Sequence, residues 1–109
     1  MKIGVDIVEI KRIAKLVHNK RFLERVYTKE EVKYCSAKKN SAQHFAVRFA
    51  TKEAVWKTLN DLKVTHKDIG VKNRADGSPE VFIKGKKRID IQISLSHADE
   101  YAVAVAILK

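Results

Sequence analysis

The chain is poor in the residues that cross-link or anchor small proteins. Cys35 is the only cysteine, so an intrachain disulfide and a cysteine-rich zinc site are both excluded. No hydrophobic run approaches the roughly 20 residues that a membrane span needs. Asp6 and Glu9 interrupt the N-terminal apolar stretch where a signal peptide would continue. Because no linker, repeat or low-complexity tract is visible either, we expect a single cytoplasmic domain over residues 1–109.

Acidic residues are scarce relative to basic ones. There are 13 of them against 23, which gives a formal net charge of +10. This excess favours an anionic partner, such as nucleic acid, an acidic protein, a phosphate-rich small molecule or a membrane surface. Hydrophobic residues make up 45% of the chain, which is typical of a folded globular protein rather than a disordered one.

The first third of the chain predicts a strand followed by helices. Residues 2–9 read as a strand, and because both of its faces carry apolar residues we expect it to be buried. A helical pattern follows over residues 10–17. Thr28 and Glu31 then have the spacing of a capping box, which predicts a short helix at about 29–37.

The rest of the chain predicts one long helix and then strands. The helix runs from residue 40 or 41 to about 59. Alternating apolar residues predict the later strands near 69–71, 81–83, 91–95 and 101–108. The last is apolar on both faces and is expected to be central in an antiparallel sheet. Together these elements predict an α+β domain.

The long helix carries charges on or beside its apolar side, in the stretch FATKEAVWK at residues 49–57. At about 100° per residue, Glu53 falls within the apolar stripe, Lys57 at its edge and Lys52 between two apolar positions. One interpretation is an ordinary helix pair of Glu53 and Lys57, with Lys52 extending out of the core. The other is that these charges have a chemical role, because burying even paired charges is expensive.

Asp6 favours the second interpretation. It stands at an apparently buried strand position, with the small Gly4 beside it on the same face. Two carboxylates brought together repel each other and attract a cation. Mg²⁺ is commonly held by one or two carboxylates together with phosphate oxygens of a substrate. We therefore expect Asp6 and Glu53 to bind a metal, with the nearby lysines serving an anion.

Four stretches of the chain together resemble one enzyme family. They are GVDIVEIKRI (4–13), RFATKEAVWK (48–57), DGSPEV (76–81) and SLSHADEYAVAVAIL (94–108). Each is weak alone, but in this order they resemble the small bacterial holo-acyl-carrier-protein synthases among the 4′-phosphopantetheinyl transferases. The resemblance covers nearly the whole chain. It implies the α+β fold of that family, with an N-terminal strand, a long central helix and an antiparallel sheet.

The resemblance also implies an activity and a set of site residues. The family transfers 4′-phosphopantetheine from coenzyme A to a serine of apo acyl carrier protein and releases adenosine 3′,5′-bisphosphate, in support of fatty acid and lipid biosynthesis. Mg²⁺ would be bound by Asp6 and Glu53, and Glu53 and Lys57 would be the catalytic residues. Coenzyme A would contact Arg48, Lys57 and His97. The general base would be either a metal-bound water or Glu53 itself.

Partners are implied in the same way. The acidic carrier protein would dock on Arg12, Arg21 and Arg25, and such a basic face should make association sensitive to salt. Family members assemble as homotrimers with active sites between subunits. Lys52 would be either a salt-bridge partner or a phosphate contact. Ser78 stands where the family commonly has lysine or arginine, which weakens any expectation of a ligand contact at that position.

Two other functions are compatible with parts of the sequence. A small basic nucleic-acid-binding protein is the alternative, but the only strand aromatics are Phe82 and Tyr101 and no RNA-binding signature is present. It also leaves Asp6 and Glu53 unexplained, so we expect no nucleic-acid partner. A non-catalytic module that binds carrier proteins is the third possibility, against which the complete acid–lysine set argues. His66 has no informative context and is expected at the surface.

Overall fold

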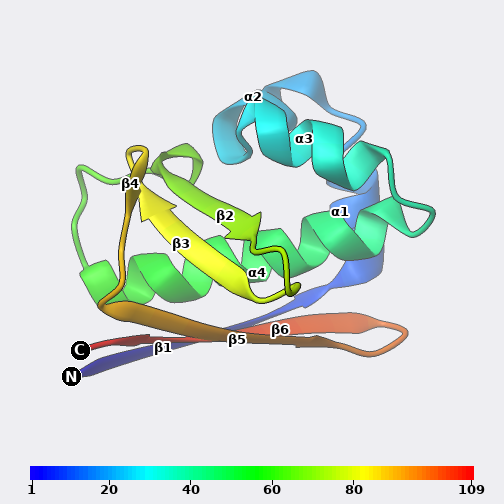
Figure 1. The fold of residues 1–109 in the computed structure, drawn as a ribbon. Coiled ribbons are helices and arrows are strands. Elements are labelled where there is room, and N and C mark those ends of the chain that lie inside the picture. Colours follow the sequence, from blue (N-terminus) through cyan, green and yellow to red (C-terminus); the bar gives the residue numbers. More distant parts are fainter.

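The computed structural model describes all of residues 1–109 and confirms the α+β class (Figure 1). The helices are α1 (Ile10–Leu16), α2 (Lys20–Val26), α3 (Lys29–Ser36), α4 (Ser41–Leu59) and the short 3-10 helix η1 (His66–Asp68). The strands are β1 (Lys2–Glu9), β2 (Ile69–Asn73), β3 (Pro79–Ile83), β4 (Lys86–Lys87), β5 (Ile91–His97) and β6 (Tyr101–Leu108). None of the helices has the length and apolarity to cross a membrane.

The strands form two antiparallel sheets of three strands rather than one sheet. The first has the order β1-β6-β5, so β6 is central as its sequence predicts. The second has the order β2-β3-β4. The long helix α4 packs along the inner face of the first sheet, and the hairpin of β2 and β3 lies on its other side, with α2 and α3 above (Figure 1). This places α4 at the centre of the molecule.

Small side chains allow α4 to lie close to the first sheet. Ala46, Ala50 and Ala54 are fully buried on the helix, opposite the buried alanines of β6. At Gly4 of β1 even a Cβ would collide with the backbone oxygen of Ala54 and lie 3.2 Å from Lys57 Cβ. The strand and the helix therefore touch through backbone at Gly4, and this contact sets the distance between their side chains.

The single apolar stripe expected for α4 is wrong. Buried residues lie around most of the helix, because it contacts the first sheet on one side and β2, α1 and α3 on the others. They are Phe45, Ala46, Arg48, Ala50, Thr51, Lys52, Ala54, Val55 and Thr58. A helix with two packing surfaces has no single stripe, which is why its charged residues could not be placed from periodicity alone.

The burial expected for both faces of β1 is also wrong. Gly4 and Val8 face α4, but Ile3, Val5 and Ile7 on the other face are 66%, 53% and 64% exposed. The helices cover only one side of the first sheet, so the opposite side remains open in the single chain.

Candidate active site

β1 and α4 bring together three of the residues singled out in the sequence. Lys57 Nζ lies 3.5 Å from Asp6 Oδ1 and donates a hydrogen bond of 2.8 Å to the backbone oxygen of Val5. Glu53 lies one turn earlier on α4, close enough to Asp6 for its charge to act on that carboxyl. The close approach at Gly4 makes this cluster possible.

The pKa of Asp6 is shifted mainly by partial burial and, to a smaller extent, by the charges of Lys57 and Glu53. Partial burial raises the pKa of Asp6 above its usual value, and the charge of Glu53 raises it further. Lys57 and Arg12 act in the opposite direction but leave a net increase. The folded chain therefore holds this carboxylate in an unfavourable state that a bound cation relieves.

The donor set fits a hard divalent cation. Asp6 and Glu53 offer carboxylate oxygens, and no group of three or more His, Cys, Asp or Glu side chains converges into a complete metal site. Mg²⁺ needs few protein ligands, because water and substrate phosphates usually complete its octahedron. Two carboxylates such as Asp6 and Glu53 are a donor set of this kind, with water and phosphate oxygens as the remaining ligands.

His66 lies against Glu53 and is not the surface residue that we expected. Its Nε2 is 3.0 Å from Glu53 Oε1, and each side chain is 28% exposed. The pair is separated by 13 positions and an irregular turn, so no local spacing pattern indicates the contact. His66 is therefore part of the site, although the sequence contains no signal for it.

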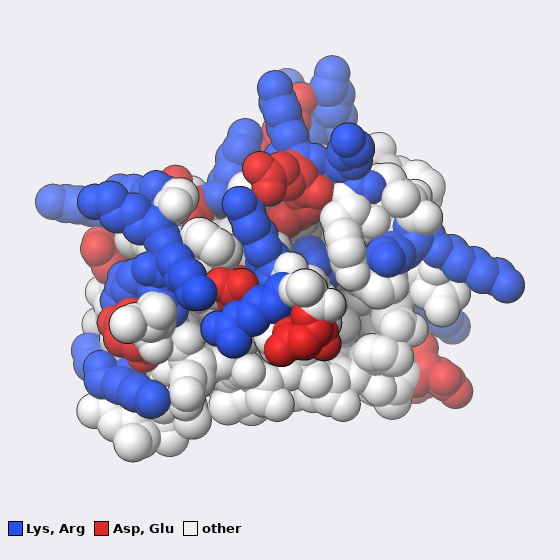
Figure 2. Space-filling model, viewed as in Figure 1, with Lys and Arg blue, Asp and Glu red and all other residues white.

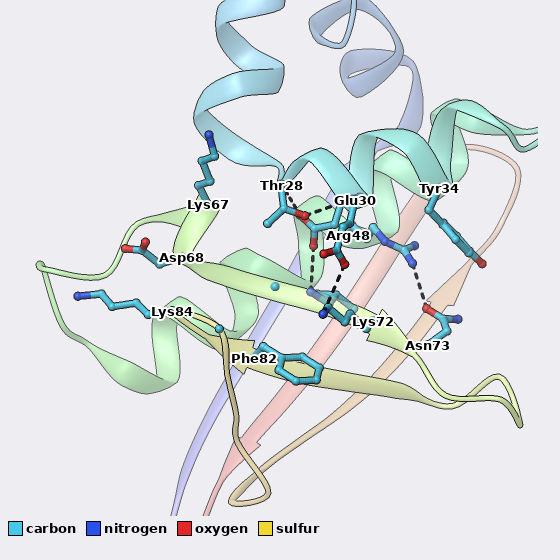
Figure 3. Close-up of a pocket in the computed structure, with 14 residues that line it drawn as sticks. Thr28, Glu30, Tyr34, Arg48, Lys67, Asp68, Lys72, Asn73, Phe82 and Lys84 are labelled. Carbon is cyan, nitrogen blue, oxygen red and sulfur yellow. Dashed lines mark hydrogen bonds and ion pairs between the residues drawn. The ribbon is translucent and has the colours of Figure 1, made fainter.

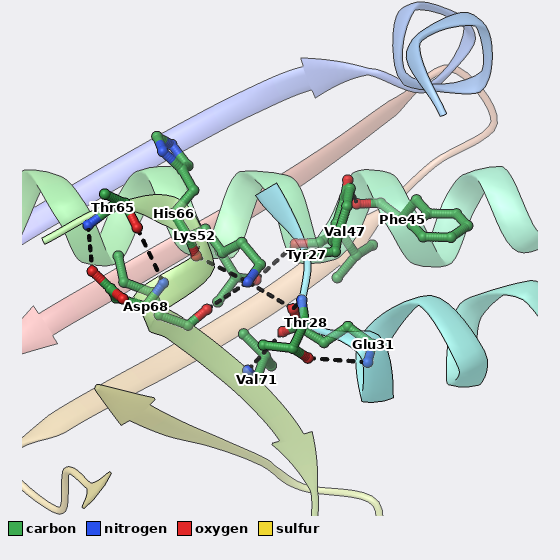
Figure 4. Close-up of polar contacts among 12 residues, drawn as sticks. Tyr27, Thr28, Glu31, Phe45, Val47, Lys52, Thr65, His66, Asp68 and Val71 are labelled. Carbon is green, nitrogen blue, oxygen red and sulfur yellow. Dashed lines mark hydrogen bonds and ion pairs between the residues drawn. The ribbon is translucent and has the colours of Figure 1, made fainter. Parts of the chain in front are cut away.

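Lys52 is a buried ion-pair partner and not a phosphate contact. Its ammonium lies 2.7 Å from Glu31 Oε1, and the two side chains are 0% and 3% exposed (Figure 4). It also donates to the backbone oxygens of His66, at 3.1 Å, and Ile69, at 2.5 Å. Burial lowers the pKa of Lys52, and Glu31 opposes that effect. Lys52 thus ties α4 to α3 and to the turn that carries His66.

Arg48 lies on a different side of α4 from the carboxylates. It precedes Glu53 by five residues, which is about 140° around the helix. The side chain is buried, donates to Asn73 Oδ1 at 3.0 Å and places its guanidinium carbon 4.3 Å from the centre of the Tyr34 ring. It borders a cavity of about 640 Å³ between α3 and β2, whose rim includes Lys67 (Figure 3).

His97 is also separate from the carboxylate cluster. It ends β5, where its Nε2 lies 3.0 Å from Nε2 of Gln43 at the start of α4. β6 lies between β5 and β1, and ten helical residues, about 15 Å, separate Gln43 from Glu53. Within one chain, Arg48 and His97 therefore do not converge on Asp6.

The basic residues expected to dock a partner are exposed on α1 and α2. They are Arg12, Arg21 and Arg25. Arg12 is near enough to Asp6 to lower the pKa of its carboxyl, so the α1 part of this surface lies near Asp6. On the face shown in Figure 2, blue lysine and arginine side chains project over much of the surface, with smaller red acidic groups among them.

Comparisons with known proteins agree with the family resemblance and the fold. The family model described as the 4′-phosphopantetheinyl transferase superfamily matches residues 2–106. A holo-[acyl-carrier-protein] synthase of Thermodesulfovibrio yellowstonii is 45% identical, with 97% of this chain and 96% of that protein covered. One from Chloroherpeton thalassium is 37% identical, with 100% and 98% covered.

Solved structures give the same result. A holo-(acyl-carrier-protein) synthase from Bacillus anthracis, in complex with CoA (3′,5′-ADP), matches with a TM-score of 0.84 at 32% identity, covering 98% of this chain and 94% of that one. The Helicobacter pylori enzyme in complex with coenzyme A matches with a TM-score of 0.83 at 28% identity, covering 98% and 99%. The chain belongs to the 4′-phosphopantetheinyl transferase superfamily and groups there with the holo-[acyl-carrier-protein] synthases.

Proposed function

We propose that this protein transfers the 4′-phosphopantetheine group from coenzyme A to a serine hydroxyl of an apo acyl carrier protein. The products are the holo carrier protein and adenosine 3′,5′-bisphosphate, so the enzyme serves fatty acid and lipid biosynthesis, with a cytoplasmic location as a prediction. The observation that carries this proposal is the meeting of Asp6, Glu53 and Lys57 where β1 touches α4, in a chain of this family.

The chain's residues suit the reaction. The serine oxygen bonds to the phosphorus that bears pantetheine, and its proton passes to Glu53 or to a water molecule at the site. The bridging P–O bond of the pyrophosphate breaks, and the leaving bisphosphate takes the electron pair. Asp6 and Glu53 would hold Mg²⁺, which when bound neutralises charge on the pyrophosphate. Lys57 is 47% exposed and hydrogen-bonded to the Val5 carbonyl, so its ammonium can face equatorial phosphate oxygens as charge develops there.

Mass spectrometry tests the activity directly. The protein is mixed with coenzyme A, Mg²⁺ and an apo acyl carrier protein, and the carrier is expected to gain the mass of one phosphopantetheine group. A carrier whose acceptor serine is replaced by alanine is the control and should gain nothing. If none of several carrier proteins gains mass, the proposed enzyme function is contradicted and the nucleic-acid-binding alternative is left open.

We further propose that the enzyme is a homotrimer with its active sites between subunits. The open face of the first sheet supports this, because Ile3, Val5 and Ile7 are more than half exposed and continue into Val103 and its neighbours on β6. Contiguous apolar surface of this kind is typical of subunit interfaces. The separation of Asp6 from His97 also favours active sites that are shared between subunits. A coenzyme molecule that contacts both residues would need Asp6 from one chain and His97 from another.

Val5→Arg tests the assembly. A charge at the centre of the open face should prevent it from packing against another subunit. Light scattering should give about three times the 12.4 kDa chain mass for the unaltered protein and one chain mass for the variant. Leu62→Arg is the matched control, because Leu62 is 87% exposed in the turn after α4. A monomeric unaltered protein, or a trimeric Val5→Arg variant, contradicts the assembly.

The exposed arginines should set the affinity for the carrier protein. In Arg12→Glu/Arg21→Glu we expect the KM for the acidic carrier protein to rise by about tenfold or more, with little change in the KM for coenzyme A, because complementary charge steers such encounters. Steady-state kinetics at two ionic strengths measures both. Lys86→Glu, an exposed lysine of β4, is the control for charge reversal. Equal increases in the two KM values contradict the docking surface.

A further inference from the structure

Two contacts fix the ring of His66 beside α4. The ring stacks on Phe49, with centroids 5.9 Å apart and planes inclined by 14°. The backbone oxygen of His66 accepts a hydrogen bond of 3.1 Å from Lys52 Nζ, and Lys52 is itself locked by its ion pair with Glu31 (Figure 4). Both the side chain and the main chain of His66 are thereby held by residues of the helix turn that leads into Glu53.

The fixed ring faces Glu53. His66 Nε2 is buried and lies 3.0 Å from Glu53 Oε1, although the pair is not aligned as a hydrogen bond in the single chain. No other ion pair or side-chain hydrogen bond engages the Glu53 carboxylate. Lys52 and Glu53 are consecutive residues of α4. Lys52 binds the backbone of the turn that contains His66, and Glu53 contacts the His66 ring. The contact is therefore built into the geometry of α4.

We propose that His66 is a positioning residue for Glu53, holding Oε1 so that the other carboxylate oxygen is left for the metal that it shares with Asp6. The inference rests on the proposed function. A free glutamate side chain loses considerable rotamer freedom when it binds a metal. A partner that orders the side chain beforehand lowers the entropy cost of metal binding. Side chains that orient the ligands of a metal typically contribute 10–100-fold to metal affinity.

Two substitutions separate the polar contact from the packing. His66→Phe keeps a flat ring against Phe49 but has no nitrogen to offer to Glu53. His66→Gln loses the ring but retains an amide N–H that reaches the carboxylate. Mn²⁺ is the probe, because its free and bound forms are distinguished by electron paramagnetic resonance. Binding is measured on the intact protein with coenzyme A present and no carrier protein, so that turnover does not enter the result.

We expect His66→Phe to weaken Mn²⁺ binding by about tenfold and His66→Gln to restore most of the loss, with similar Tm values for the two variants. Equal weakening in both variants shows that only ring packing matters and overturns the role. Unchanged or tighter binding in His66→Phe also overturns it, as does failure of the unaltered protein to bind Mn²⁺. Transfer in the mass assay tests the proposed function separately, so it can stand when this inference fails.

Discussion

Asp6→Asn and Glu53→Gln should each lower the rate of phosphopantetheine transfer by about a thousandfold or more, while the fold remains intact. The expected size follows from the loss of preorganised charge at the centre of a phosphoryl transfer, where one well-placed group is worth about 100- to 1,000-fold. On the proposed assignment, each change removes a metal ligand and also alters the charge balance beside Lys57. Single-turnover kinetics at saturating Mg²⁺ and coenzyme A measures the effect on the chemical step.

Stability provides the internal control for Asp6→Asn. Because burial and Glu53 raise the pKa of Asp6, the ionised carboxylate is disfavoured in the folded chain. That penalty is absent below the unfolded value of 3.8 and is fully present above the raised folded value. In metal-free buffer at pH 7 the Tm of Asp6→Asn should therefore equal or exceed that of the unaltered protein, and the difference should vanish in acid.

A matched substitution elsewhere completes the experiment. Glu30→Gln removes a carboxylate from α3, where the side chain is 75% exposed and pairs with Lys72 at 3.4 Å. Its transfer rate should stay within about twofold of the original, since exposed ion pairs contribute little. A near-normal rate in Asp6→Asn or Glu53→Gln would falsify the metal assignment, whatever the behaviour of Glu30→Gln.

The carboxylate pair was predictable because each member conflicts with its local pattern. Asp6 stands on the helix-facing side of an apolar strand, and Glu53 falls within an apolar stretch of α4. Residues that break a pattern without an evident packing reason are enriched at functional sites. The four motifs then supplied the family, and with it the roles that spacing alone does not assign.

Contacts between distant segments were not predictable in the same way. His66 meets Glu53, and Glu31 meets Lys52, across turns whose path depends on tertiary packing. The Thr28–Glu31 capping box was expected and is present, yet Glu31 also accepts from the backbone N–H of Val71 at 2.9 Å. The local sequence pattern predicts the helix cap formed by Thr28 and Glu31, but it does not predict the contact between Glu31 and Val71.

The exposed face of β1 shows a further limit of pattern reading. Apolar residues on both faces of a strand favour burial of both faces, but they do not show what would cover each one. Helix α4 covers one face, and the other is open in the single chain. The apolar pattern of β1 therefore does not distinguish a strand buried on both faces within its own chain from one with a face exposed in the single chain.

Removing one member of the buried Glu31–Lys52 pair should have the largest effect on stability. Lys52→Met leaves the Glu31 carboxylate buried without a counter-charge, and breaking such a pair typically costs about 3–5 kcal/mol. It also leaves the backbone oxygens of His66 and Ile69 without their donor. Urea denaturation should show a loss of this size in the free energy of unfolding. Lys67→Met, at an exposed lysine of η1, should stay within about 0.5 kcal/mol.

The double variant Glu31→Gln/Lys52→Met isolates the unpaired charge from the lost packing. Glutamine retains the capping-box geometry with Thr28, as position N3 accepts either residue, but carries no charge. We expect the double variant to regain about 2 kcal/mol relative to Lys52→Met, since the uncompensated carboxylate is then absent. If the double variant instead loses as much free energy of unfolding as Glu31→Gln and Lys52→Met lose together, the two residues are not energetically coupled. Because Lys52 also holds the turn that carries His66, Lys52→Met should weaken Mn²⁺ binding even where the chain remains folded.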